Sequence, residues 1–141
     1  MALICDTSGI YALYDADCFE HSVISAVCEA EIGPLLLPVI LLAEIDYLLH
    51  SRLGPDAAID FMQAIQQEEF TLVPLLAQDL VRCRELAVQY RDLEIGLADA
   101  TVAATAERLH INRLLTLDQR HFRTIIPRNL APFILLPADV P

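Results

Sequence analysis

Short apolar runs alternate along this chain with longer stretches of helical period, and this alternation restricts the possible folds more than any other feature. Short apolar runs bounded by turn residues are typical of buried strands, and the longer periodic stretches are typical of helices. Strands that alternate with helices favour a parallel sheet with helices packed on it, so the predicted class is α/β. The expected strands cover 2–6, 35–37, 70–73, 113–117 and 132–136, and the expected helices cover 8–15, 18–32, 39–53, 56–67, 76–92, 97–110 and 119–122.

The bulk properties predict one globular domain over residues 1–141. The chain has 141 residues, 55% of them hydrophobic, which is enough for a real core and excludes disorder. No apolar run reaches the roughly 18 residues of a spanning helix, so no membrane association is expected. The four cysteines show no Cys-x-x-Cys spacing, so we expect reduced thiols and a cytoplasmic protein.

Four acids stand at positions where apolar or capping residues are usual. Asp6 ends the first apolar run, Glu44 lies inside VILLAEIDYLL, Asp99 lies in GLADATVAATAERL, and Asp118 follows RLLTL. Ligands of open α/β sheets bind beyond the carboxyl ends of the strands, where Asp6 and Asp118 are expected. Asp99 continues the inward stripe of its helix, so four acids from separate segments are expected to converge on one cleft, and that pattern predicts a metal site.

Glu44 gives the strongest single indication of such a site. Its helical neighbours three and four positions away include Ile40, Leu41 and Leu48, which places the carboxylate on the apolar stripe. A buried carboxylate without a cationic partner costs several kcal/mol or becomes protonated. Glu44 is therefore expected to be the most desolvated of the four acids and the one whose pKa is raised most.

Each of the other acids also has an ordinary structural interpretation. Asp6 fits an Asx turn, Asp118 fits a helix N-cap, and Asp99 fits the first turn of a helix, where a carboxylate complements the macrodipole. Only their joint occurrence favours a metal site. His121 follows Asp118 by three residues, but a single histidine is more often a packing residue, and we interpret it in that way.

The distribution of charge limits the available chemistry. The net charge is −11, residues 1–70 hold twelve acids and one Arg, and residues 71–141 hold eight acids and eight Arg. Lys is absent, which excludes a P-loop and Schiff-base chemistry. A mean hydropathy of +0.46 is high for a chain of this size and suggests apolar surface covered by a second copy or another protein, although a large core would give the same value.

With these residues placed, the chain resembles the PIN-domain ribonucleases, and within them the VapC-type toxins of toxin–antitoxin pairs. The similarity rests on the segments ICDTSGIYAL, LLAEIDYLL, GLADATVAATAERL and LLTLDQRHF, which occur in the family's order. The resemblance implies a three-layer α/β/α sandwich with a mainly parallel sheet. It also implies a Mg²⁺- or Mn²⁺-dependent endoribonuclease whose acids are Asp6, Glu44, Asp99 and Asp118, with metal-assisting hydroxyls at Ser8 and Thr116.

The resemblance also implies partners, namely an RNA substrate and a small antitoxin protein, and the apolar surface indicated by the mean hydropathy leads us to expect a homodimer. Arg120 and Arg123 lie three residues apart in the only net-positive segment, and we expect them to contact RNA phosphates. Whether Glu44 is a metal ligand or a base acting on the attacking water stays open. Two alternatives also stay open: an RNA-processing nuclease outside a toxin system, and a catalytically silent PIN-like interaction module.

Overall fold

A single five-stranded sheet organises the molecule. The structure is a computed structural model that describes residues 1–140. All neighbouring strands are parallel, with Leu3 opposite Leu35 and Ile4 opposite Leu114, and the strand order is β3-β2-β1-β4-β5. The strands are β1 (Leu3–Cys5), β2 (Leu35–Pro38), β3 (Thr71–Val73), β4 (Arg113–Leu115) and β5 (Ile134–Leu136). The predicted strands and the parallel sheet are thus confirmed.

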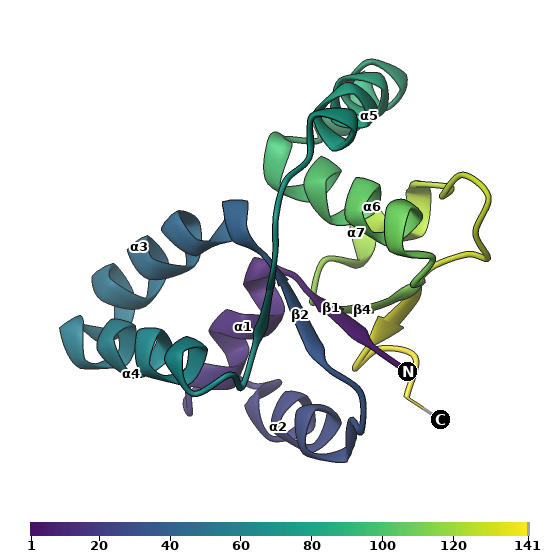
Figure 1. Ribbon diagram of the computed structural model, residues 1–141. Helices are drawn as coiled ribbons and strands as arrows, with labels where there is room; N and C mark the ends of the chain where they lie inside the picture. Colours follow the sequence, from purple (N-terminus) through teal and green to yellow (C-terminus); the bar gives the residue numbers. More distant parts are fainter. Residues whose placement is uncertain (141) are drawn as a thin grey trace.

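Helices cover both faces of this sheet, which confirms the predicted α/β/α sandwich (Figure 1). The first two crossovers run from β1 to β2 and from β2 to β3, and they carry α1 to α4 on one face. The path then returns past β1 to β4, so the right-handed crossover places α5 to α7 on the opposite face. The helices are α1 (Thr7–Tyr14), α2 (His21–Ala30), α3 (Leu42–Leu53), α4 (Pro55–Gln66), α5 (Ala77–Gln89), α6 (Leu97–Leu109) and α7 (Gln119–Thr124).

Two short 3₁₀ turns complete the described elements. The turn η1 (Val39–Leu41) leads from β2 into α3, and η2 (Arg91–Leu93) lies in the connection from α5 to α6. The sequence pattern predicted the first region as part of a helix but did not predict η2. Glu94 follows η2 with a φ of 55°, in the left-handed region, which turns the chain toward the start of α6. None of the described helices has the length and apolarity required to cross a lipid bilayer.

The core lies between the sheet and its two helical layers. Every residue of β1 is fully buried, as are the inner residues of β4, because central strands of a two-sided sheet are covered on both faces. On one face α6 contributes small side chains such as Ala103 and Ala106, which allow close packing on the sheet.

Gly9 allows α1 to approach the end of β4 unusually closely. A Cβ atom at this position would lie 2.5 Å from the carbonyl oxygen of Leu115, a distance that real Cβ atoms do not adopt. Only glycine fits there without displacement of the backbone. The close approach brings the first turn of α1, which carries Ser8, directly against the residues that follow β4.

Glu44 corrects one expectation about the fold. It is exposed, whereas the buried stripe of this segment consists of Leu41, Ile45 and Leu49. The reason is that the inward stripe of α3 passes through Ile45 and Leu49, so Glu44 lies about 100° away from it around the helix. Glu44 nevertheless lies in the first turn of α3, which follows β2 and the 3₁₀ turn.

Candidate metal and active site

The site forms where the chain reverses its winding direction, between the carboxyl ends of β1 and β4. These two strands are adjacent, and the backbone N–H of Asp6 donates to the carbonyl of Leu115 at 2.9 Å. Asp6 follows β1, and Thr116 and Asp118 follow β4. In open α/β sheets, the crevice at such a reversal is the usual place for a ligand.

Two hydroxyls hold the carboxylate of Asp6. The Thr116 Oγ1 donates to Asp6 Oδ2 at 2.8 Å, and Ser8 Oγ lies 3.3 Å from the same oxygen. The hydroxyls are themselves fixed, because Thr116 accepts from the N–H of Asp118 at 3.0 Å and Ser8 accepts from the N–H of Leu117 at 2.9 Å. Both residues predicted as metal-assisting hydroxyls therefore lie against Asp6.

Glu44 was expected from the sequence to be the most desolvated of the four acids, but the most desolvated one is Asp6. Its exposed fraction is 5%. Burial raises the pKa of Asp6 to about 6, although the hydrogen bond from Thr116 lowers it, and the neighbouring charges of Asp99 and Asp118 raise it further. Among the described residues, no arginine or histidine forms an ion pair with Asp6. A buried carboxylate held only by neutral donors is a site for an added cation.

Asp99, Asp118 and His121 form the second part of the site. Asp99 lies in the first turn of α6, and Asp118 is the N-cap of α7, where its Oδ1 accepts from the backbone N–H of His121 at 3.0 Å. The three side chains each offer one ligand atom, and these atoms all lie within 4.8 Å of one another. They are partly buried, and the arrangement brings together acids from α6 and α7, which β4 separates along the chain.

The ring of His121 bridges these carboxylates. Its Nδ1 lies 2.6 Å from Asp118 Oδ2 and 3.2 Å from Asp99 Oδ2, and its Nε2 lies 3.0 Å from the carbonyl oxygen of Leu93. Carbonyl and ionised carboxylate oxygens accept only, so these contacts favour a ring in which both nitrogens donate. Burial lowers the pKa of His121, but the hydrogen bond and charge of Asp118, with the charge of Asp99, outweigh burial and raise it.

The expectation that His121 is only a packing residue is therefore wrong, because its ring contacts two carboxylates and a backbone carbonyl. A sequence signal was available, because Asp118 and His121 are three residues apart at a helix start, and that spacing places both side chains on one face. The contact with Asp99 is tertiary and has no sequence signal.

The charge of Glu44 also acts on Asp99. Burial raises the pKa of Asp99 first, the charge of Asp118 raises it further, and Glu44 adds to the rise, whereas His121 opposes it. Glu44 is thus close enough to act on the site electrostatically, from its exposed position at the start of α3. The four predicted acids are thus linked electrostatically, because Asp99 and Asp118 act on Asp6, and Glu44 acts on Asp99.

The two arginines predicted to contact phosphate differ in their surroundings. Arg123 donates twice to the carboxylate of Asp139, at 2.6 and 2.9 Å, so its guanidinium is engaged by the segment after β5. Arg120 is exposed on α7, and no side-chain partner of Arg120 occurs among the described residues. Of the pair, Arg120 is the one that is available to a polyanion next to Asp118.

The donor set fits a hard divalent cation. Carboxylate oxygens dominate, and Mg²⁺ and Mn²⁺ prefer oxygen ligands. The observation that supports the fit is Asp6, a buried carboxylate without a cationic partner in the described residues, beside Asp99 and Asp118, whose mutual repulsion only His121 offsets. The residues that could hold the ion are Asp6, Asp99 and Asp118, with Glu44 at the edge.

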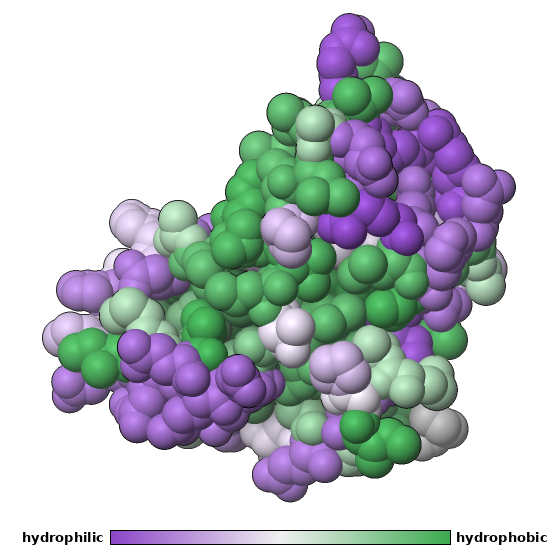
Figure 2. Space-filling view, viewed as in Figure 1, coloured by the Kyte–Doolittle hydropathy of each residue, from purple (hydrophilic) through white to green (hydrophobic). Residues whose placement is uncertain are grey.

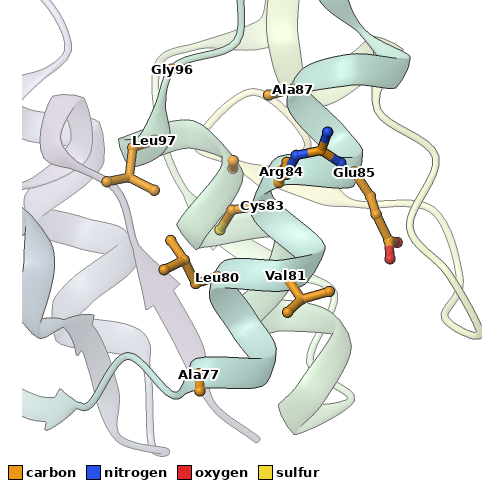
Figure 3. A pocket seen from close by; sticks show the side chains of 10 residues that line it. Ala77, Leu80, Val81, Cys83, Arg84, Glu85, Ala87, Gly96 and Leu97 are labelled. Atoms are coloured by element: carbon orange, nitrogen blue, oxygen red, sulfur yellow. The ribbon is translucent and has the colours of Figure 1, made fainter.

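An apolar groove lies close to this cleft. It has a volume of about 640 Å³ and runs between α5 and the start of α6. Figure 3 shows Leu80 and Cys83 of α5 near Leu97 of α6, which is two residues from Asp99. The exposed fractions of Leu80 and Leu97 are 51% and 48%. Figure 2 shows hydrophobic residues gathered over this region and toward the centre of the same face.

Comparison with known proteins identifies the family of this chain. The model of the PIN domain family matches residues 3–125. Ribonuclease VapC26 of Mycobacterium tuberculosis is 30% identical over 135 residues, which cover 96% of this chain and all of VapC26. The chain belongs to the PIN-domain family and resembles its VapC-type ribonucleases over nearly its whole length.

Two solved structures show the same fold. The crystal structure of Mycobacterium tuberculosis VapC20, described as a sarcin–ricin loop cleaving toxin, superposes with a TM-score of 0.77 at 21% identity and covers 89% of this chain and 98% of VapC20. The crystal structure of Rickettsia felis VapBC2, bound to a DNA fragment from its promoter, gives a TM-score of 0.66 at 14% identity, with 96% and 97% coverage. The PIN-like α/β/α sandwich expected from the sequence is confirmed.

Proposed function

We propose that this protein is a metal-dependent endoribonuclease, the toxin of a toxin–antitoxin pair, that acts through one PIN domain over residues 1–141. The observation that supports the proposal most strongly is the environment of Asp6. Its carboxylate is buried at the reversal point of the sheet, has only neutral hydrogen-bond donors as partners, and is influenced by the charges of two further acids. Such an arrangement is unfavourable without a cation and favourable with one. The relation to Ribonuclease VapC26 supports RNA as the substrate.

Each residue of the cleft receives a defined role. Asp6, Asp99 and Asp118 bind the metal. Thr116 and Ser8 orient the Asp6 carboxylate, which fixes the direction of its lone pairs. Glu44 is either a further ligand or the base that accepts a proton from the attacking water, and its exposed position leaves room for that water.

The cofactor in this proposal is Mg²⁺ or Mn²⁺. A divalent cation supplies Lewis-acid chemistry, since it lowers the pKa of water and stabilises negative charge on phosphate oxygens. The protein has no lysine that could stabilise that charge instead. Arg120, exposed beside Asp118, binds a phosphate next to the scissile bond and so offsets part of the repulsion between RNA and an acidic protein.

The decisive experiment measures cleavage of a single-stranded RNA by the purified protein with Mg²⁺ or Mn²⁺ and with excess EDTA. Asp99→Asn removes one charge and keeps the side-chain shape, so cleavage should be lost while the fold remains. The matched control is Asp56→Asn, because Asp56 is also a first-turn acid but lies on α4, and it should cleave normally. Full activity of Asp99→Asn, or of the wild type in EDTA, would refute the metal-dependent assignment.

The proposed inhibitor is a small antitoxin whose helix lies in the groove between α5 and α6. An arginine of that protein would enter the acidic cleft, because a guanidinium forks onto carboxylates. The groove leads to Leu97, two residues from Asp99, so one short chain can reach both places. Leu80→Asp should weaken the complex and leave cleavage intact, whereas Ile59→Asp, at an equally exposed position on α4, should affect neither.

The exposed apolar surface and the free cysteines bear on the oligomeric state and the location of the protein. We propose a homodimer, formed through apolar surface that the monomer exposes, and light scattering on the isolated protein tests it. We also propose a cytoplasmic location, which four free cysteines support. If expression of the chain alone is harmless to its host and no small protein accompanies it, the toxin role is refuted, and a nuclease of RNA processing or a silent interaction module would take its place.

A further inference from the structure

His121 occupies an unusual place between the cleft and the chain that precedes α6. Its backbone N–H and its Nδ1 reach the two oxygens of Asp118, at 3.0 and 2.6 Å, so one residue fixes that carboxylate completely. The same Nδ1 lies 3.2 Å from Asp99. On the other side of the ring, Nε2 donates to the carbonyl of Leu93 at 3.0 Å. The ring therefore contacts three separate segments of the fold.

These contacts hold together two carboxylates whose charges repel each other. Asp99 belongs to α6 and Asp118 to the start of α7, and their charges repel each other, as the raised pKa of Asp99 indicates. Leu93 ends the turn η2, and after Glu94 the chain enters α6 within a few residues. A ring fixed at Leu93 thus fixes the start of α7 relative to the start of α6. These are the two elements that carry the two acids.

The contacts also leave one oxygen of Asp99 available for a ligand. Nδ1 faces Oδ2 of Asp99, and within residues 1–140 no hydrogen bond to Oδ1 of Asp99 occurs. Hydrogen bonds from outer residues to metal-binding carboxylates orient those carboxylates and strengthen metal binding. His121 has the contacts of such an outer residue, together with an anchor at Leu93 that prevents the ring from turning away.

We propose that His121 is a positioning residue of the metal site, which holds Asp99 and Asp118 together so that they can bind one divalent cation. The proposal rests on the metal-dependent function proposed above. It assigns the ring no contact with RNA and no direct bond to the metal. It also makes the turn Arg91–Leu93 a part of the site, through the Leu93 carbonyl.

Binding of Mn²⁺ alone, measured from the loss of the electron paramagnetic resonance signal of free Mn²⁺, tests the proposal without reliance on cleavage. We expect His121→Ala to weaken Mn²⁺ binding about 10- to 100-fold. His121→Asn retains a donor near the position of Nδ1 and should recover part of the affinity. His121→Gln can reach Leu93 but not both carboxylates and should resemble His121→Ala. His50→Ala removes an exposed histidine on α3 and should bind as the wild type does.

Cleavage gives a second readout. The KM for RNA should stay unchanged in His121→Ala, and kcat should be low at limiting Mn²⁺ and rise again at saturating Mn²⁺, which general structural damage would not produce. Wild-type affinity for Mn²⁺ in both His121→Ala and His121→Asn would overturn the proposal. A ¹⁴N coupling to bound Mn²⁺ that disappears in His121→Ala would also overturn it, because the ring would then be a ligand. If the wild type itself binds no Mn²⁺, the metal-dependent function proposed above is refuted, and the role of His121 is refuted with it.

Discussion

Replacement of Asp6 by Asn should stabilise the metal-free protein at neutral pH. The pKa of Asp6 is raised from an ordinary 3.8 to about 6, so the folded state favours the neutral carboxyl group. About two pKa units at 1.36 kcal/mol each correspond to about 3 kcal/mol. Asn stays neutral and can still accept from Thr116, but it sacrifices the hydrogen bond from the Thr7 backbone, about 1 kcal/mol. The expected net gain is about 2 to 3 kcal/mol.

The stability difference between Asp6→Asn and the wild type should increase with pH. The neutral form of Asp6 stabilises the fold fully below the unfolded pKa of about 4, and this contribution is lost as pH rises through about 6. The difference between Asp6→Asn and wild type in EDTA should therefore be small near pH 4 and largest at pH 7 and above. For a chain of this length, the shift of melting temperature at pH 7 should be about 7 to 10 °C.

Thermal unfolding in EDTA, followed by circular dichroism from pH 4 to pH 8, measures this difference. Added Mg²⁺ should stabilise the wild type but not Asp6→Asn, because ligand binding stabilises only the form that binds it. Asp17→Asn makes the same chemical change at an exposed loop position and should leave the unfolding curve unchanged. The reasoning is refuted if Asp6→Asn is less stable than wild type at pH 7 without metal, or if the difference does not depend on pH.

The remaining predictions concern RNA binding, the close approach of α1, and metal removal. Arg120→Ala should raise the KM for RNA with little change in kcat and reduce the salt slope of binding by about one unit, whereas Arg123→Ala should change KM less because its guanidinium is already engaged. Gly9→Ala should destabilise the protein by about 1 to 3 kcal/mol in chemical denaturation, since its Cβ would meet the Leu115 carbonyl. Chelation should abolish cleavage, and added Mg²⁺ or Mn²⁺ should restore it to the full initial rate.

The element order was predictable because each element has a clear local signal. Every predicted strand and helix is present, within the usual uncertainty at the ends. The positions of Asp6 and Asp118 were predictable for a related reason, since residues that directly follow parallel strands must lie at one edge of the sheet. That β1 and β4 are neighbours is a property of the whole fold, and it is what brings Thr116 against Asp6.

The site was less predictable where a tertiary contact or the orientation of a helix determines the surroundings of a side chain. Glu44 is exposed because the buried stripe of α3 passes through Ile45 and Leu49, one residue away from the stripe that the apolar pattern suggested, and one residue corresponds to a rotation of about 100°. The partner of Arg123 lies at Asp139, sixteen residues away, and the link from His121 to Leu93 spans twenty-eight residues. Separations of this size leave no periodic signal in a single sequence.

The position of all four acids at helix starts explains how the fold tolerates them. Asp6 precedes α1, Glu44 and Asp99 lie in the first turns of α3 and α6, and Asp118 caps α7. In a parallel sheet these helix starts meet at one edge, so the positive ends of several helix dipoles face the acids. Each dipole contributes typically 0.3 to 1 kcal/mol, which is less than the roughly 3 kcal/mol that ionised Asp6 alone costs. The dipoles therefore reduce the repulsion without cancelling it, and a divalent cation, with its larger and closer charge, is what would allow all four carboxylates to be ionised together.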